Sequence, residues 1–244
     1  MVAKLLYLGK RGRPDILLPV QSLCTRVKAP TVEDEKKLER VLGYLQLTKC
    51  WIRVFDNSPF DRVRTYIDAS FAIHADRKSQ SGCAVLLGNT LVHETCRKQK
   101  IITLNSTEAE LVALSDHIQE GELIKEFLFD MGALCDIPVM DNVHLVYQDN
   151  KPTITMVATG GGKARTKYMR VRAGYVKERL ESKELEIEYV RTTNMLADVL
   201  TKPLSGEGYH DLVRLLLGCS KFQSSYAGNR GVKNKMVQSN ERAT

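Results

Sequence analysis

The sequence predicts an α/β fold in which helices pack on a mixed five-stranded sheet, with a helical segment ahead of it. The alternation of strand-like and helix-like segments predicts this class, and the composition indicates a globular chain. After residue 62, short stretches rich in β-branched and aromatic residues alternate with segments of helical periodicity. Apolar residues make up 43% and charged residues 27%, as is usual for a globular chain. No stretch approaches about 18 uninterrupted apolar residues, so we expect neither a membrane span nor a membrane partner.

The segment 1–58 is predicted to be helical. Its clearest helix covers residues 31–45, where Thr31 can act as the cap and apolar residues recur at i, i+3, i+4 and i+7. A stretch of this length cannot bury a core of its own. It must therefore pack on something else, and a domain outside this chain is one candidate.

The α/β domain is expected over residues 62–204. Its first three strands are predicted at 63–71, 83–88 and 90–96. A helix is predicted to begin near Asn105 and to run toward residue 127, with Asn105 and Glu108 forming a capping box at its start. The order βββαβααβα is typical of a mixed sheet with helices packed on it. The later elements are a strand at 143–148, a short helix after Pro152, a basic helix at 163–180, a strand at 185–190 and a helix at 194–200.

Two pieces follow the domain. Residues 205–218 are predicted to be a short helical extension. Residues 219–244 are rich in Ser, Asn, Gly and Lys, a composition typical of a disordered basic tail.

Charge and cysteine content narrow the function classes. Lys and Arg exceed Asp and Glu by 36 − 29 = +7, which favours a polyanionic partner without requiring one. The six cysteines form no Cys-x-x-Cys pair and have no His at zinc spacing, so we expect neither a structural zinc nor a disulfide framework. The amino terminus has no recognisable signal peptide, which predicts an intracellular protein.

Four acidic residues occupy unusual places. They are Asp68 inside an apolar strand, Glu110 in the first turns of a helix, Asp149 at a strand end, and Asp198 among apolar residues. Each alone has an ordinary explanation, such as a helix cap or a pair with Lys202. Together, carboxylates gathered without His or Cys suit Mg²⁺.

The motifs around these acids resemble the RNase H domain of copia-type LTR retrotransposon Pol polyproteins. The segment 5–17 is similar to the end of the reverse transcriptase of the same polyproteins, and the resemblance covers about residues 5–217. The matching motifs are Tyr66–Ala72, Asp76–Gly82, Arg97–Gln99, Leu104–Leu114, Tyr147–Asn150, Arg165–Lys167, Glu188–Val190 and Leu196–Leu204.

The resemblance implies an RNase H-like fold and Mg²⁺-dependent cleavage of the RNA strand in RNA/DNA hybrids. It implies that two Mg²⁺ ions are held by Asp68, Glu110, Asp149 and Asp198. Glu110 matches the family's ligand because it precedes an apolar residue, whereas Glu108 fits the capping box. The implied partners are the hybrid and a reverse transcriptase domain or subunit, and the implied locations are the cytoplasmic retrotransposon particle and the nucleus.

A second group of residues is expected to touch nucleic acid. The basic stretch after Gly162 suits phosphate contact, although a solvated helix face has the same composition. Residues next to the acids can touch the backbone or ribose, although each also suits a cap or turn. The candidates are Lys98, Gln99, Ser106, Thr107, Asn150, Lys163, Arg165, Lys167 and Arg170.

Departures from the family pattern keep other functions open. Tyr168 and Arg170 stand where the family has His and Asp, Ser70 replaces a second Asp, and residues 191–193 offer no His. The rival hypothesis is a degenerate, catalytically inactive fragment that keeps the fold and only binds nucleic acid. A different nuclease or an integrase on the same fold is a third, which the Leu196–Leu204 block disfavours. The chain has no adjacent Asp-Asp pair, so we expect no polymerase activity from it alone.

Overall fold

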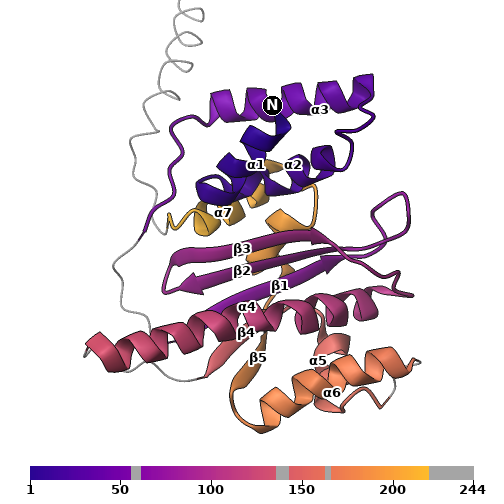
Figure 1. The fold of residues 1–244 in the computed structure, drawn as a ribbon, viewed down its shortest axis with the longest axis vertical. Coiled ribbons are helices and arrows are strands. Elements are labelled where there is room, and N and C mark those ends of the chain that lie inside the picture. Colours follow the sequence, from indigo (N-terminus) through magenta and orange to yellow (C-terminus); the bar gives the residue numbers. More distant parts are fainter. Residues whose placement is uncertain (56–61, 136–142, 163–165, 220–244) are drawn as a thin grey trace, which may run out of the picture.

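The computed structural model describes residues 1–55, 62–135, 143–162 and 166–219. Its central feature is a five-stranded mixed sheet (Figure 1). The strand order is β3-β2-β1-β4-β5, with β1, β2 and β3 antiparallel and β4 and β5 parallel to β1. This confirms the predicted fold class. The strands are β1 (Val63–Ser70), β2 (Gln80–Leu87), β3 (Thr90–Lys98), β4 (His144–Gln148) and β5 (Leu185–Tyr189).

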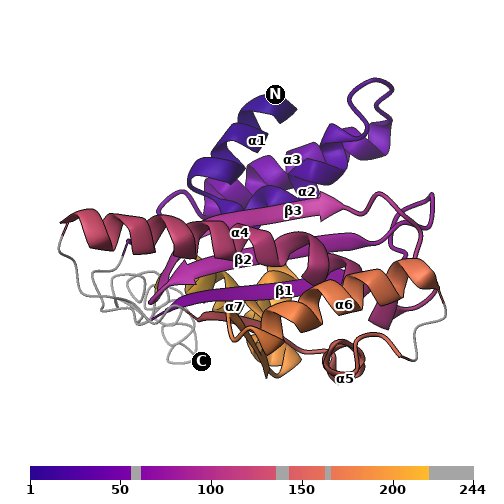
Figure 2. The same cartoon turned by 60° about the horizontal axis from the view of Figure 1, so that its bottom comes forward.

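Helices cover both faces of the sheet (Figures 1 and 2). Alternate residues of β2 enter two separate cores, because successive side chains of a strand point to opposite faces. Cys83 and Val85 pack with α4, whereas Ala84 and Leu86 pack with α7 and its preceding turn. The first face carries α4 (Ser106–Cys135), α5 (Lys151–Ala158) and α6 (Lys167–Glu181), and the second carries α7 (Gly206–Leu216) with the 3₁₀ turns η2 (Thr192–Asn194) and η3 (Leu196–Leu200).

Several predicted boundaries shift. Strand β2 begins at Gln80 rather than at residue 83, and the helix predicted over 194–200 is a pair of 3₁₀ turns. The backbone N–H of Asp198 donates to Met195 and that of Thr201 to Asp198, which are i→i+3 bonds. The start of the predicted basic helix and the tail beyond residue 219 lie outside the described residues.

The start of α4 follows the predicted capping logic with one change. The backbone N–H of Glu108 donates to the Asn105 side chain at 2.9 Å. The Glu108 carboxylate accepts from the backbone of Leu104 at 2.9 Å, and not from that of Asn105. Two hydrogen bonds therefore hold the start of the helix, and both the backbone and the side chain of Glu108 take part in them.

The amino-terminal helices pack on the same domain, through β3 and α7 (Figure 1). Leu17 enters the core on the α7 face of the sheet. A buried network joins the Arg13–Asp15 ion pair, at 2.7 Å, to the hydroxyl of Tyr44, which lies 3.2 Å from that of Tyr209 in α7. A partner outside the chain is not needed to cover this segment. Its elements are α1 (Val2–Arg11), η1 (Pro14–Ile16), α2 (Leu17–Cys24) and α3 (Val32–Leu47).

Within the described part of the chain, no helix has both the length and the apolar character to span a membrane.

Candidate active site

Three of the four predicted carboxylates meet at one edge of the sheet. Oxygen atoms of Asp68, Glu110 and Asp149 all lie within 4.8 Å of one another. Strands β1 and β4 are parallel neighbours, and Tyr66 stands opposite Tyr147, which places Asp68 level with Asp149 two residues on. The first turns of α4, which packs on β1, bring Glu110 to the same edge.

The fourth carboxylate is joined to this cluster through a lysine. The Lys202 ammonium donates to Asp198 at 2.7 Å and to Asp68 at 3.1 Å. A pair with Lys202 is the alternative explanation that the sequence offers for an acid at position 198. The structure shows that pair and also connects it to the carboxylate cluster.

Neutral side chains hold the carboxylates in place. Thr201 donates its hydroxyl proton to Asp68, and Thr192 donates to Asp149 at 2.7 Å. Gln148 donates to Glu110 at 3.5 Å. The sequence analysis did not single out these three, although Thr201 lies in the Leu196–Leu204 motif and Gln148 in Tyr147–Asn150.

Burial and mutual repulsion disfavour the charged forms of these carboxylates. Burial raises the pKa of Asp68 and raises that of Glu110 well above its usual value, and nearby carboxylates raise both further. Burial, followed by the charge of Asp68, raises the pKa of Asp198 to about 7. Lys202 opposes all three shifts. A divalent cation would relieve the remaining repulsion.

The donor set fits a hard cation. The clustered ligand atoms are carboxylate oxygens alone, which Mg²⁺ prefers over nitrogen or sulfur. The chemistry that such a site can support is metal-assisted transfer at a phosphate.

The candidate nucleic-acid contacts divide into exposed and committed side chains. Ser106, Lys167 and Arg170 are exposed. Lys98 is paired with Asp76 at 2.8 Å. Gln99 is buried, and its amide nitrogen donates to Ser81 and to the backbone of Ala109, both at 2.9 Å.

The remaining candidates lie near the start of α5 or outside the described residues. Asn150 is the N-cap of α5 and accepts from the backbone of Thr153 at 3.0 Å. The Thr153 hydroxyl in turn donates to the backbone carbonyl of Thr107 at 3.3 Å. Lys163 and Arg165 fall outside the part of the chain that the structure describes.

Part of the basic charge on α6 is neutralised within the protein. Arg172 pairs with Asp116 at 2.5 Å and Arg179 with Glu184 at 2.7 Å. Arg172 also donates to the hydroxyl of Tyr168, the residue that departs from the family pattern, and lies over its ring. The exposed Lys167 and Arg170 remain at the start of the helix, where a polyanion has access to them.

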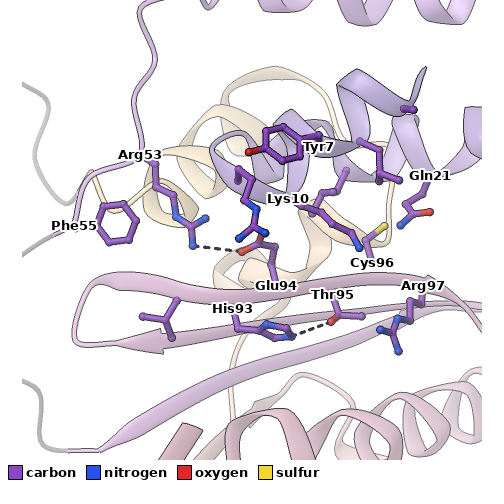
Figure 3. A pocket seen from close by; sticks show the side chains of 15 residues that line it. Tyr7, Lys10, Gln21, Arg53, Phe55, His93, Glu94, Thr95, Cys96 and Arg97 are labelled. Atoms are coloured by element: carbon purple, nitrogen blue, oxygen red, sulfur yellow. Dashed lines mark hydrogen bonds and ion pairs between the residues drawn. The ribbon is translucent and has the colours of Figure 1, made fainter. Parts of the chain in front are cut away.

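A cavity of about 690 Å³ lies between α1 and β3 (Figure 3). Lys10, Arg11, Arg53 and Arg97 line it together with apolar side chains, and Arg53 is tied to Glu94 at 3.4 Å. None of the four carboxylates lines this cavity, so it is separate from the candidate active site.

Comparison with known proteins gives relatives of one kind. The chain is 29% identical over 212 residues to the retrovirus-related Pol polyprotein from transposon RE1 of Arabidopsis thaliana, covering 86% of this chain and 14% of that protein. It is 28% identical over 202 residues to that from transposon TNT 1-94 of Nicotiana tabacum, covering 82% and 15%. The chain thus spans about a seventh of the length of these relatives.

Solved structures give a weaker likeness, and no family model matches the chain. LC11 RNase H1, solved in complex with an RNA/DNA hybrid, has a TM-score of 0.42 and 14% identity, covering 57% of this chain and 94% of that one. Over most of its length, this chain is therefore related to the Pol polyproteins of copia-type transposons, as its motifs predict.

Proposed function

We propose that this chain is the RNase H part of a transposon Pol polyprotein and hydrolyses the RNA strand of RNA/DNA hybrids with Mg²⁺. The observation that carries the proposal is the meeting of Asp68, Glu110 and Asp149 within 4.8 Å, from three elements far apart in the sequence. The similarity to Pol polyproteins supports it.

The four carboxylates would hold two Mg²⁺ ions, which supply an activated water and stabilise the leaving 3′ oxygen. Thr201 and Gln148 fix the carboxylates of Asp68 and Glu110 through hydrogen bonds. Because Lys202 contacts both Asp68 and Asp198, it keeps the fourth carboxylate turned toward the cluster.

Substrate binding is assigned to the basic and polar side chains that the sequence predicts for this role. Lys167 and Arg170, together with Lys98, Lys163 and Arg165, would contact backbone phosphates, which gives salt-dependent affinity without sequence preference. Ser106, Thr107 and Asn150 are the candidates for contact with the ribose, whose 2′-hydroxyl distinguishes RNA from DNA. Gln99 is not among them, because it is buried and its amide nitrogen is used within the protein.

The amino-terminal helices are assigned the connection to a reverse transcriptase domain or subunit. Their packing on β3 and α7 fixes how such a domain would be oriented relative to the carboxylates. The proposed setting is the retrotransposon particle in the cytoplasm, and the nucleus.

One contact favours a second function. The Lys202 ammonium lies between Asp68 and Asp198, at 3.1 and 2.7 Å, and already supplies positive charge there. A protein that used this lysine in place of an ion would keep the fold and bind nucleic acid without cutting it.

The test is cleavage of an end-labelled RNA/DNA hybrid by a matched pair of variants. Glu110→Gln removes a clustered carboxylate, whereas Glu108→Gln alters a glutamate used in the cap of the same helix. We expect Glu110→Gln to lose about a hundredfold or more, since several kcal/mol of charge stabilisation disappear. Glu108→Gln should retain activity, and single-stranded RNA should stay intact. Equal activity of the two variants would contradict the proposal.

A further inference from the structure

A second group of metal-binding side chains lies away from the carboxylates. The ligand atoms of Cys83 on β2 and of His117 and Glu120 on α4 all lie within 4.8 Å of one another. His117 and Glu120 are one helical turn apart, and their Nδ1 and Oε1 atoms are separated by 3.1 Å. His93 on β3 adds a fourth group, with its Nε2 atom 3.2 Å from Glu120 Oε2.

The cluster runs from the interior to the surface. Cys83 is fully buried and His117 is 4% exposed. The side chains of Glu120 and His93 are 20% and 44% exposed, so an ion can reach the group from solvent. Figure 3 shows His93 and Thr95 next to each other on β3, joined by a hydrogen bond of 3.2 Å.

Thr95 orients the carboxylate at the centre of the group. It is the register partner of Cys83 across β2 and β3. Its hydroxyl lies 3.1 and 3.0 Å from the two oxygens of Glu120. Such a contact to a ligating carboxylate is typical of metal centres, where outer partners fix the ligands.

The donor types differ from those of the candidate active site. One thiol, two imidazoles and one carboxylate form a borderline-soft set that suits Zn²⁺ rather than Mg²⁺. Glu110 and His117 are seven positions apart, which corresponds to about 10 Å along a helix, so the two groups can bind ions independently.

We propose that Cys83, His117 and Glu120 bind one Zn²⁺-class divalent cation, with His93 as the fourth ligand. Binding would release the thiol proton of Cys83 and any imidazole proton on the ligating nitrogens, and no electron transfer is involved. The ion would join α4 to β2 and β3 and so stabilise the packing on the sheet of the helix that carries Glu110. The spacing of Cys and His along the sequence predicts no zinc site, because such spacing identifies only ligands that are close together in the sequence. These four side chains come from three separate elements.

The experiment is a Co²⁺ titration of the reduced full-length chain, stripped by chelator and held in excess Mg²⁺ to occupy the carboxylate cluster. We expect one equivalent of Co²⁺ to produce a thiolate-to-cobalt charge-transfer band and tetrahedral ligand-field bands, both abolished by Zn²⁺. Cys83→Ser should remove the charge-transfer band. Cys50→Ser, which changes an exposed thiol outside the cluster, should retain it.

Further variants separate binding from folding. Glu120→Gln and His93→Gln should each weaken Co²⁺ binding by about tenfold or more, with circular dichroism of the metal-free protein unchanged. Zn²⁺ should raise the melting temperature of the Cys50→Ser protein by more than that of Glu120→Gln. A missing charge-transfer band, or one that survives in Cys83→Ser, would overturn the site. Unchanged affinity in His93→Gln would overturn the assignment of the fourth ligand.

Discussion

At the scale of single residues, the sequence predicts the acids of the site better than their partners. The structure brings Asp68, Glu110 and Asp149 together, and it was the resemblance of their surrounding motifs that singled them out as ligands. Thr192, just beyond the end of β5, donates to Asp149, just beyond the end of β4, a contact that no local pattern encodes. Lys202 was expected to pair with Asp198 at i+4, but its bond to Asp68 crosses 134 positions of the chain.

The pH dependence of stability tests the charge balance at Asp198. Its pKa, raised from 3.8 to about 7, means that the folded protein holds this proton more tightly than the unfolded chain. The resulting stabilisation is complete below the unfolded pKa and is lost as the pH rises through about 7. In chelator, Asp198→Asn should therefore gain stability relative to the wild type between about pH 5 and about pH 8.

Urea unfolding of both proteins at the two pH values measures this difference. The same series for Glu33→Gln, an exposed carboxylate on α3, is the control and should show no such gain. A stability difference between Asp198→Asn and wild type that stays constant with pH would contradict the account.

At the scale of elements, the order of strands and helices follows from periodicity, whereas their ends depend on tertiary contacts. The largely apolar segment Leu196–Leu200 suggests a helix, but it folds as a 3₁₀ turn, and Thr201 and Lys202 just after it both reach Asp68. Strand β2 extends to Gln80 because it pairs with Ser70 and Lys98 on its two neighbours. Pairing of this kind cannot be derived from a single segment.

The crossing of α4 over the sheet depends on one glycine. A Cβ atom at Gly121 would lie 2.2 Å from His144 Nε2 and 2.6 Å from Thr65 Oγ1. Gly121→Ala should destabilise the protein by about 1–3 kcal/mol, because overpacking outweighs the helix-propensity gain of about 0.5–1 kcal/mol. Gly43→Ala, on α3 with nothing within 4 Å, should instead stabilise by the propensity gain. Thermal or urea unfolding decides, and equal stabilisation by both would refute the close approach.

At the scale of the whole molecule, the amino-terminal helices form one body with the α/β domain. Asp15 accepts bonds from Arg13 and Tyr44 in a buried network that reaches α7. Asp15→Ala should cost about 3–5 kcal/mol, because it leaves the Arg13 guanidinium buried without its partner. Glu33→Ala, which breaks an exposed pair with Lys36, should change stability by less than about 0.5 kcal/mol. Comparable unfolding midpoints for the two variants would argue against this docking.

The net charge of +7 is also a property of the whole molecule, and it predicts salt-dependent binding of an RNA/DNA hybrid. Replacing Lys167 and Arg170 together by Ala should lower the slope of log K against log salt by about two, one for each phosphate contact. Lys36→Ala changes a residue of α3, a helix on the other side of the sheet from α6 (Figure 1), and should leave the slope unchanged. Fluorescence anisotropy at several salt concentrations measures it, and equal slopes in all three proteins would remove α6 from the interface.

The most direct test of the central claim is cleavage of an end-labelled RNA/DNA hybrid in Mg²⁺ by the wild type and by Asp149→Asn. Asp149 is half-buried, and its carboxylate accepts a hydrogen bond from Thr192. Asn has the same shape and keeps an accepting oxygen, so the fold should be retained. We predict cleavage of the RNA strand by the wild type and a loss of about a hundredfold or more in the variant, with hybrid binding retained. A wild type that binds the hybrid and leaves it intact, even with a complete reverse transcriptase added, would contradict the account and favour the inactive binding protein.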